Sequence, residues 1–561
     1  MDRLIETFEA IVGPGHVHVG ERATRRFRKG YRYGDGEILA AVRPATLLEQ
    51  WRVLEACVAA DVIVIFQAAN TGLTGGSTPA GNDYDRPIVI INTMRIDRID
   101  LIEEGRQVIA LPGATLDKLE KALRPIGREP HSVIGSSCIG ASVTGGVCNN
   151  SGGSLIRRGP AYTQFALYAQ IDAEGRLQLV NHLGVALGDD PETVLSRLDR
   201  KDYRDSDITH ASNQWASDKQ YCEHVRDIDA PTPARFNADP RRHYEASGSA
   251  GRIGVFAVRL DTFEADKDVT VFYIGANDPN TLGEIRRDIL ARFENLPIAG
   301  EYIHREAYET AQVYGKDLFL FIRAFGTDNV PKAYAAKSWF DGLTEQLRLG
   351  STIGDHVLNA LARLWPEHLP KRMNEYRDRY AHHLLLKMGG AGVAEARQYL
   401  AARLPSGDAD FFECTKEEGE AAFLHRFVVG GSVVRYRATH KKTVENIVAL
   451  DVALPRNAVD WFETLPASIT ERIERTIYCG HFFCHVLHQE YLAKKGVDCH
   501  ALEEEMLAIL DTRGAQYPAE HNVGHLYKAQ PALEDFYRSL DPTNSFNPGI
   551  GKTSRKKMWA A

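Results

Sequence analysis

The spacing of apolar residues in the first 130 positions predicts alternating helices and strands. Apolar side chains recur at helical spacing over residues 47–60 and again over residues 116–126. Three short apolar runs, residues 62–66, 88–92 and 107–111, have the length of strands. This part of the chain is therefore expected to adopt an α+β fold.

Two long stretches of small residues interrupt this pattern, QAANTGLTGGSTP at residues 67–79 and HSVIGSSCIGASVTGGVCNNSGG at residues 131–153. The first follows a predicted strand and the second follows a predicted helix. A phosphate group can be held by successive backbone N–H groups, and small residues let the backbone come close enough to do so. An ordinary surface loop is the alternative for either stretch alone. Together they predict a large cofactor that contains a diphosphate.

The spacing of the glycines disfavours two common phosphate sites. A dinucleotide fingerprint of the G-x-G-x-x-G type needs three glycines that Asn70, Gly72 and Gly75 do not supply, which disfavours a nicotinamide cofactor. The run Gly551-Lys552-Thr553 resembles the end of a P-loop, but Phe546 occupies the required upstream glycine position. An ATPase is therefore also disfavoured.

Composition describes an ordinary globular protein of more than one domain. The chain has 561 residues, of which 44% are hydrophobic and 25% charged. Residues 1–13 carry acidic groups where a signal peptide has a basic segment, which predicts a cytoplasmic protein. No apolar run approaches the length of a membrane span, so any membrane contact is expected to be peripheral. The net charge of -8 disfavours nucleic acid as a partner.

Basic residues are nevertheless concentrated in the second half of the chain. Residues 331–380 contain eight Lys or Arg against six Asp or Glu, and residues 419–442 contain five against one. Such charge also occurs on ordinary solvated faces. Because aromatic residues are interspersed, the pattern also suits an anionic lipid surface. On that interpretation Arg426, Arg435 and Arg437 are expected to contact lipid headgroups.

Histidines are concentrated in GHFFCHVLH at residues 480–488. The intervening FFCHVL is β-like, and on a continuous strand His481 and His485 would share one face while His488 would lie on the other. That arrangement disfavours a simple metal site built from His481 and His488. A satisfied core position is the usual alternative for any one of these histidines.

A second histidine segment, PAEHNVGH at residues 518–525, follows a helical pattern at residues 501–513 and is expected to be a loop. Glu520 and His521 are adjacent there. Abstraction of a proton from a carbinol needs a base with a pKa near neutrality, and a neighbouring carboxylate can tune an imidazole to that range. Both residues are therefore candidate catalytic groups.

Taken together, the two loops, the PAEHNVGH segment and the terminal DPTNSFNPGIGKT resemble flavoproteins of the vanillyl-alcohol oxidase/PCMH type. Within that type, the chain is similar to the family of respiratory, quinone-dependent D-lactate dehydrogenases. The likeness covers nearly the whole length and includes REPHSVIGSSCIGAS, TPARFNADP, VFAVRLDTFEA and RGAQYPAEHNVGHLYKA.

The resemblance implies an α+β architecture with a two-subdomain FAD-binding domain of the PCMH type, an α+β cap domain and an inserted, mainly helical, basic membrane-binding region. The implied limits are 1–262 and 512–561 for the FAD-binding domain, 263–303, 381–418 and 443–511 for the cap, and 304–380 and 419–442 for the membrane-binding region.

The resemblance also implies where the cofactors bind. Non-covalent FAD is expected to contact Ala68, Ala69, Asn70, Thr71, Gly72, Gly76, Ser77, Gly135, Ser142, Gly152 and Val255. Some related enzymes bind a divalent metal through residues that match His481, His488 and Glu520. In this chain FFCHV replaces the usual GDGN between the histidines, so the sequence leaves the metal open.

The activity that the resemblance implies is oxidation of D-lactate to pyruvate. His521 would take the hydroxyl proton, a hydride would pass to FAD, and electrons would then pass to a membrane quinone. The expected location is the cytoplasmic face of the cell inner membrane, held peripherally on an anionic lipid surface. The alternatives are an FAD-dependent oxidase or dehydrogenase for another D-2-hydroxy acid and a non-enzymatic lipid-surface protein.

Overall fold

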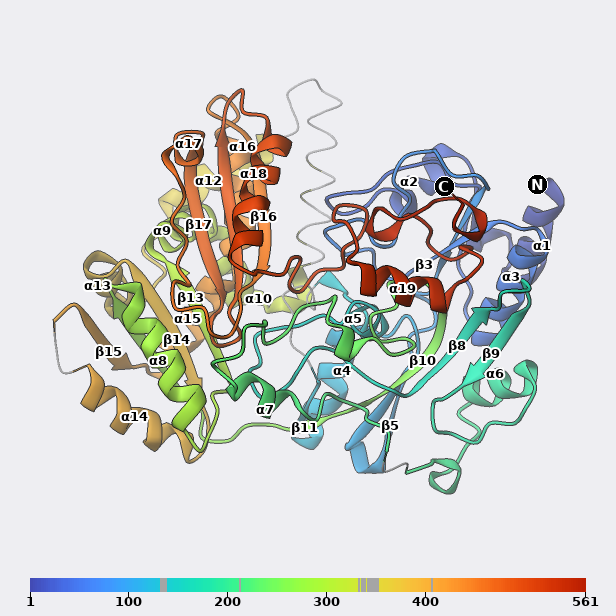
Figure 1. Ribbon diagram of the computed structural model, residues 1–561, viewed down its shortest axis with the longest axis horizontal. Helices are drawn as coiled ribbons and strands as arrows, with labels where there is room; N and C mark the ends of the chain where they lie inside the picture. The colour runs from blue at the N-terminus through green and yellow to red at the C-terminus, as the bar shows by residue number, and fades with distance from the viewer. Residues whose placement is uncertain are drawn as a thin grey trace.

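The computed structural model describes residues 1–131, 139–210, 213–330, 353–404 and 407–560 and the single residues 333, 337 and 340 (Figure 1). Helices and strands are mixed throughout, as the sequence pattern predicts. The sheets near the N-terminus lie in the right half of the view, and the largest sheet lies in the left half (Figure 1).

The first sheet has the strand order β1-β2-β4-β3, and its last three strands are parallel. Its strands are β1 (Val17–His18), β2 (Ala40–Val42), β4 (Ile88–Asn92) and β3 (Ile63–Gln67). The helices of this part are α1 (Asp2–Val12), α2 (Glu21–Arg28) and α3 (Leu47–Ala59). The Thr46 side chain accepts a hydrogen bond from the Glu49 backbone N–H at 3.0 Å and so caps α3. The strands at β3 and β4 confirm the apolar runs seen in the sequence.

The second sheet is antiparallel with the order β5-β6-β10-β8-β9. Its strands are β5 (Ile99–Ile102), β6 (Gln107–Ala110), β10 (Gly254–Asp261), β8 (Ala166–Ile171) and β9 (Leu177–Asn181). The helices α4 (Leu116–Leu123) and α5 (Val143–Cys148) pack on it, while α6 (Pro191–Asp199) and α7 (Tyr221–Arg226) lie in the connection to β10. A two-stranded sheet pairs β7 (Arg128–Glu129) with β11 (Phe263–Glu264).

The C-terminal segment returns to the first sheet. After α18 (Cys499–Thr512) and α19 (Pro531–Leu540), Phe546 forms a parallel bridge with Val64 of β3. The Asn547 side-chain amide then donates to the Gly76 carbonyl at 2.8 Å. The last part of the chain therefore supports the loop that follows β3.

The largest sheet has seven antiparallel strands in the order β15-β12-β14-β13-β17-β18-β16. These are β15 (Ala409–Glu413), β12 (Thr270–Ala276), β14 (His382–Met388), β13 (Ala299–His304), β17 (Ile473–His481), β18 (Val486–Lys494) and β16 (Val444–Ala453). Alternation along β12 separates two cores. Phe272 faces a core shared with α8 (Pro279–Arg292) and α14 (Gly392–Arg403), whereas Tyr273 faces the helices on the opposite side.

Those opposite helices form a layer on the large sheet. They are α9 (Arg305–Tyr314), α10 (Lys316–Phe325), α12 (Ile353–Leu364), α13 (Lys371–Arg379), α15 (Lys416–Phe427) and α16 (Val429–Thr439). Among the helices that the structure describes, none combines the length and apolarity needed to cross a bilayer.

One lipid-contact expectation is wrong within this layer. The Arg435 guanidinium pairs with Asp317 at 2.9 Å and with Asp355 at 2.9 Å, and its side chain is only 12% exposed. Because its charge is already neutralised inside the helical layer, Arg435 holds α10, α12 and α16 together. Arg437, two residues further on, is exposed.

Candidate active site

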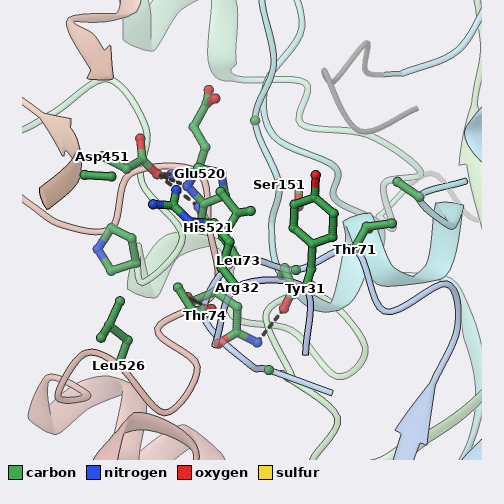
Figure 2. Close-up of a pocket in the computed structure, with 18 of the residues that line it drawn as sticks. Tyr31, Arg32, Thr71, Leu73, Thr74, Ser151, Asp451, Glu520, His521 and Leu526 are labelled. Atoms are coloured by element: carbon green, nitrogen blue, oxygen red, sulfur yellow. Dashed lines mark hydrogen bonds and ion pairs between the residues drawn. The ribbon is translucent and has the colours of Figure 1, made fainter. Parts of the chain in front are cut away.

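A cavity of about 1590 Å³ is lined both by the two small-residue loops and by the large sheet (Figure 2). It brings together all the predicted site residues that lie in the described part of the chain. On its lining are Ala68, Ala69, Asn70, Thr71, Gly72, Gly76, Ser77, Ser142, Gly152, Val255, His481, His488, Glu520 and His521. The remaining predicted contact, Gly135, lies outside the described residues.

The loop after β3 has the shape expected of a cofactor cradle. Asn70 adopts a left-handed backbone conformation with φ 55°, which asparagine tolerates better than most residues. Its side-chain oxygen accepts a hydrogen bond from the Ser77 hydroxyl at 3.1 Å, which ties the two ends of the loop together. A Cβ placed on Gly72 meets no protein atom within 4 Å, so this stretch of backbone faces open space. The cavity and its loops therefore fit a large diphosphate cofactor such as FAD.

The histidines of residues 480–488 lie on a hairpin, so the expectation of a continuous strand is wrong. β17 ends at His481, a short 3-10 turn covers Phe482–Cys484, and His485 has a φ of 52°. In the resulting register Cys479 faces His488 and His481 faces Val486, which places His481 and His488 on the same face of the sheet. Their ring centroids are 5.1 Å apart. His485 is instead buried, with Nδ1 3.1 Å from the Pro455 carbonyl oxygen.

Glu520 completes a cluster with these two histidines. Its Oε2 lies 3.2 Å from His481 Nε2 and 3.8 Å from His488 Nε2. The three side chains offer ligand atoms that all lie within 4.8 Å of one another. The remaining ring nitrogens face carboxylates, since His481 Nδ1 is 2.6 Å from Glu301 and His488 Nδ1 is 3.3 Å from Asp451. Carboxylates that orient histidines in this way are typical of metal sites.

The charges of this cluster shift one another's protonation strongly. Burial alone would lower the pKa of His481, but the carboxylates of Glu301 and Glu520 outweigh burial and raise it to about 10. Burial would raise the pKa of Glu520, but His481 and Arg235 lower it to about 2. Arg235 Nη2 lies 2.7 Å from Glu520 Oε1. Glu520 is therefore an anion that keeps Oε2 turned toward the histidines.

His521 is oriented by Asp451 of β16. Its Nδ1 lies 2.7 Å from Asp451 Oδ2, which also accepts the backbone N–H of Glu520 at 2.7 Å (Figure 2). Burial lowers the pKa of His521, but the Asp451 carboxylate outweighs this effect and the pKa is raised. With Nδ1 held, Nε2 is the ring nitrogen left to exchange a proton with a ligand. The pair lies between α18 and α19, outside any helix or strand, which confirms the predicted loop.

Gly152 is required by the close approach of the second loop to this cluster. A Cβ at this position would lie 2.4 Å from Glu520 Oε1 and 2.9 Å from Arg235 Nε. The small-residue loop and the carboxylate are therefore in direct contact, and a side chain larger than hydrogen would displace Glu520.

The charged residues of the sheet were not among the residues predicted from the sequence. Glu301 and Asp451 each stand alone among apolar residues of their strands, in IAGEYIH and VALDVAL, and a lone charge in a buried strand is a usable signal. The expectation that Arg426 contacts lipid is also wrong. Its side chain is 12% exposed, lines the cavity and lies 3.1 Å from Glu301.

Comparison with known proteins agrees with this architecture. A family model described as "D-lactate dehydrogenase, membrane binding" matches residues 271–559, and one described as "FAD binding domain" matches residues 38–181. The chain resembles the solved structure of p-cresol methylhydroxylase with a TM-score of 0.58 and 12% identity, covering 99% of this chain and 97% of that one. This likeness confirms the expected PCMH-type fold.

Two curated relatives are much more similar in sequence. The quinone-dependent D-lactate dehydrogenase of Escherichia coli (strain K12) is 57% identical over 98% of this chain and 96% of its own length. The enzyme of the same name from Haemophilus influenzae is 57% identical over the full length of both chains. This chain therefore belongs to the family of quinone-dependent D-lactate dehydrogenases, with an FAD-binding domain and a membrane-binding portion.

Proposed function

We propose that this protein oxidises D-lactate to pyruvate at non-covalently bound FAD and delivers the electrons to a membrane quinone. The observation that carries the proposal is the His521–Asp451 pair, which shares one cavity with the two small-residue loops. When bound, FAD supplies a two-electron acceptor for the hydride of the substrate carbon. Both alternatives would use the same cavity. An oxidase would differ in its electron acceptor, and a dehydrogenase for another D-2-hydroxy acid would differ in its substrate.

His521 is the proposed general base. Its Nδ1 is held by Asp451, which fixes the ring and stabilises the imidazolium that forms when Nε2 accepts the hydroxyl proton of the substrate. Asp451 also accepts the backbone N–H groups of Glu520 and His521, so the whole segment is fixed against β16. Glu520 is the second proposed catalytic residue. Its negative charge would hold a positively charged group beside the substrate.

His481, His488 and Glu520 are the residues that would hold a divalent metal. Two imidazole nitrogens and a carboxylate oxygen suit a transition metal such as Zn²⁺ or Mn²⁺. The ion would polarise the substrate hydroxyl and carboxylate oxygens as a Lewis acid. The fit is supported by Glu301 and Asp451, which already turn the Nε2 atoms of the two histidines toward Glu520.

The FAD contacts proposed are the small residues of the two loops, together with Val255 of β10. We further propose the domain division that the resemblance implies, with two adjustments. β11 pairs with β7, so the cap begins after Glu264. α15 runs across position 419, so the whole helix belongs with the membrane-binding region.

Arg32 is the proposed partner of the substrate carboxylate. Arg32 is an exposed residue that lines the same cavity as His521, and its positive charge acts to lower the pKa of His521. Among the residues that the structure describes, none forms an ion pair with Arg32, whereas Arg426 is already paired with Glu301. An arginine fork matches a carboxylate. Replacement of Arg32 by Gln is expected to raise KM for D-lactate about 10-fold or more with a smaller change in kcat.

Membrane association is proposed to be peripheral, on the cytoplasmic face of the inner membrane and at an anionic lipid surface. The family description of residues 271–559 supports membrane binding, and the exposed basic residues of the helical layer, Arg323, Arg363 and Arg437, support anionic lipid. Binding to vesicles with and without phosphatidylglycerol tests the lipid preference.

The decisive experiment measures the spectrum of the bound flavin in stopped flow. D-Lactate is expected to bleach the flavin, and L-lactate is not. A quinone analogue is expected to reoxidise the reduced enzyme much faster than oxygen does. Fast oxygen turnover would favour the oxidase, preferential bleaching by a longer D-2-hydroxy acid would change the substrate, and a preparation without flavin would leave a lipid-surface protein.

A further inference from the structure

The helix α12 (Ile353–Leu364) buries polar side chains and exposes large apolar ones, which is the reverse of a normal surface helix. Its buried residues are Gly354, Asp355, Asn359 and Ala362, two of which are polar. Its exposed positions include three large apolar side chains, and Trp365 extends the same surface just after the helix. The exposed fractions are 46% for Val357, 47% for Leu361, 81% for Leu364 and 43% for Trp365.

The inward orientation of the polar face is fixed by charge pairing. Asp355 is only 12% exposed and accepts Arg435 Nε at 2.9 Å and Lys337 Nζ at 3.1 Å. Rotating the helix to bury its leucines would expose these ion pairs and leave Arg435 inside the layer without Asp355. The helical layer therefore holds the apolar face of α12 outward.

The exposed apolar positions lie on one narrow stripe. At 3.6 residues per turn, Val357, Leu361 and Leu364 fall within one side of the helix. Arg363 and His356 are exposed beside this stripe. The helices α10 and α16, which both contact α12, also carry exposed apolar side chains, Phe325 at 62% and Val434 at 56%. Large apolar side chains exposed along one helix face, with cationic residues beside them, mark a contact site.

We propose that α12 is an interfacial helix whose apolar face enters the acyl region of a lipid bilayer. Its length of about 18 Å allows it to lie in the membrane plane, with Arg363 and Arg323 of α10 at headgroup level. The family description that covers this segment is a membrane-binding one, which commits the surface to lipid rather than to a second protein. The proposal rests on the proposed function, since the bilayer is the source of the quinone. It adds insertion to the charge attraction expected from composition.

The test uses the full-length holoenzyme and vesicles of phosphatidylcholine alone or mixed with phosphatidylglycerol. The double variant Leu361→Gln/Leu364→Gln is expected to bind both vesicle types at least roughly 10-fold more weakly, because two leucines no longer leave water. The loss should persist in high salt, which screens charge but not insertion. Val459→Gln is the matched control, since Val459 is 65% exposed in the loop after β16. Unchanged binding of the double variant would overturn the proposal.

The depth to which α12 enters the bilayer is measured separately, with the fluorescence of Trp365. Phosphatidylcholine brominated on the acyl chains is expected to quench the fluorescence contributed by Trp365, obtained as the difference between the protein and its Trp365→Phe variant. If the Trp365 fluorescence is not quenched, the proposed insertion of α12 into the acyl region is wrong. Sedimentation of the protein without lipid tests the alternative partner, which is a second copy of this chain. A dimer that the double variant abolishes would assign the surface to that second copy. Flavin reduction by D-lactate with a soluble dye as acceptor is measured in the same preparations. Its failure would reject the proposed function, while the vesicle results would still decide the role of α12.

Discussion

The two walls of the cavity are built on different principles. The wall after β3 and around α5 consists of small side chains, and its binding capacity comes from the backbone. The wall formed by the large sheet contributes ionisable side chains, Glu301, Asp451, His481 and His488, which come from four different strands. The first wall can accommodate a group of a given shape, and the second can move protons and hold an ion. Substitutions should therefore affect cofactor retention on one side and chemistry on the other.

The largest effect is expected on the charged wall, for His521→Ala. Loss of a positioned base should reduce kcat by about 10²–10⁴-fold, while FAD remains bound because the loops are unchanged. Turnover and flavin content per chain check the two parts. Turnover near that of the unchanged protein would remove His521 from the mechanism, and loss of FAD would show that the two walls are not separable.

A smaller effect is expected for Glu301→Gln, because Glu301 orients His481 without entering the cluster of three ligands. The affinity for a divalent metal should fall about 10–100-fold. Titration of the metal-free protein with Zn²⁺ or Mn²⁺, followed by calorimetry, measures this change. Glu463→Gln is the control, since Glu463 is a buried carboxylate that accepts the Tyr478 hydroxyl at 2.7 Å instead. Equal affinities in the two variants would argue against a metal at this cluster.

Two glycines on the small-residue wall should respond in opposite ways. Gly152→Ala forces a Cβ against Glu520 and is expected to lower the free energy of unfolding by about 1–3 kcal/mol. Gly72→Ala meets no protein atom and should leave the stability of the apoprotein unchanged while weakening FAD binding. Urea unfolding without FAD and flavin titration separate the two effects. A destabilised Gly72→Ala apoprotein would contradict the open backbone described for this loop.

The smallest effect concerns surface charge. Arg437→Gln should weaken binding to anionic vesicles about fivefold, corresponding to about 1 kcal/mol per cation, and the effect should fade in high salt. Arg426→Gln should leave vesicle binding unchanged, because this guanidinium lies in the cavity beside Glu301. The reverse result would place Arg426 at the lipid surface.

The contrast between the walls also explains which parts of the site could be predicted from the sequence. A loop of small residues is a local pattern, so a cofactor loop at residues 67–79 could be predicted from its composition and from the strand before it. β4 begins and ends where its apolar run predicts. The charged wall depends on pairing between distant strands. His481 and His488 share a face only because a tight turn reverses the chain between them, and the β-like FFCHVL gives no local sign of that turn.

The same limit applies to the arginines. Arg426, Arg435 and Arg437 are equivalent in a count of charges, yet the structure places one in the cavity, one in a buried ion-pair group and one at the surface. Which acid each arginine meets is decided by helix packing. Composition therefore identifies a basic region but not the residues within it that remain available to a partner.

The support that the C-terminal segment gives to β3 has a consequence for synthesis of the protein. Asn547 holds the Gly76 carbonyl and also donates its backbone N–H to Val64. The loop that forms the small-residue wall is made early on the ribosome, but its supporting segment is translated more than 450 residues later. The cradle is therefore completed only after nearly the whole chain has emerged, and cofactor uptake is expected to follow translation rather than to accompany it.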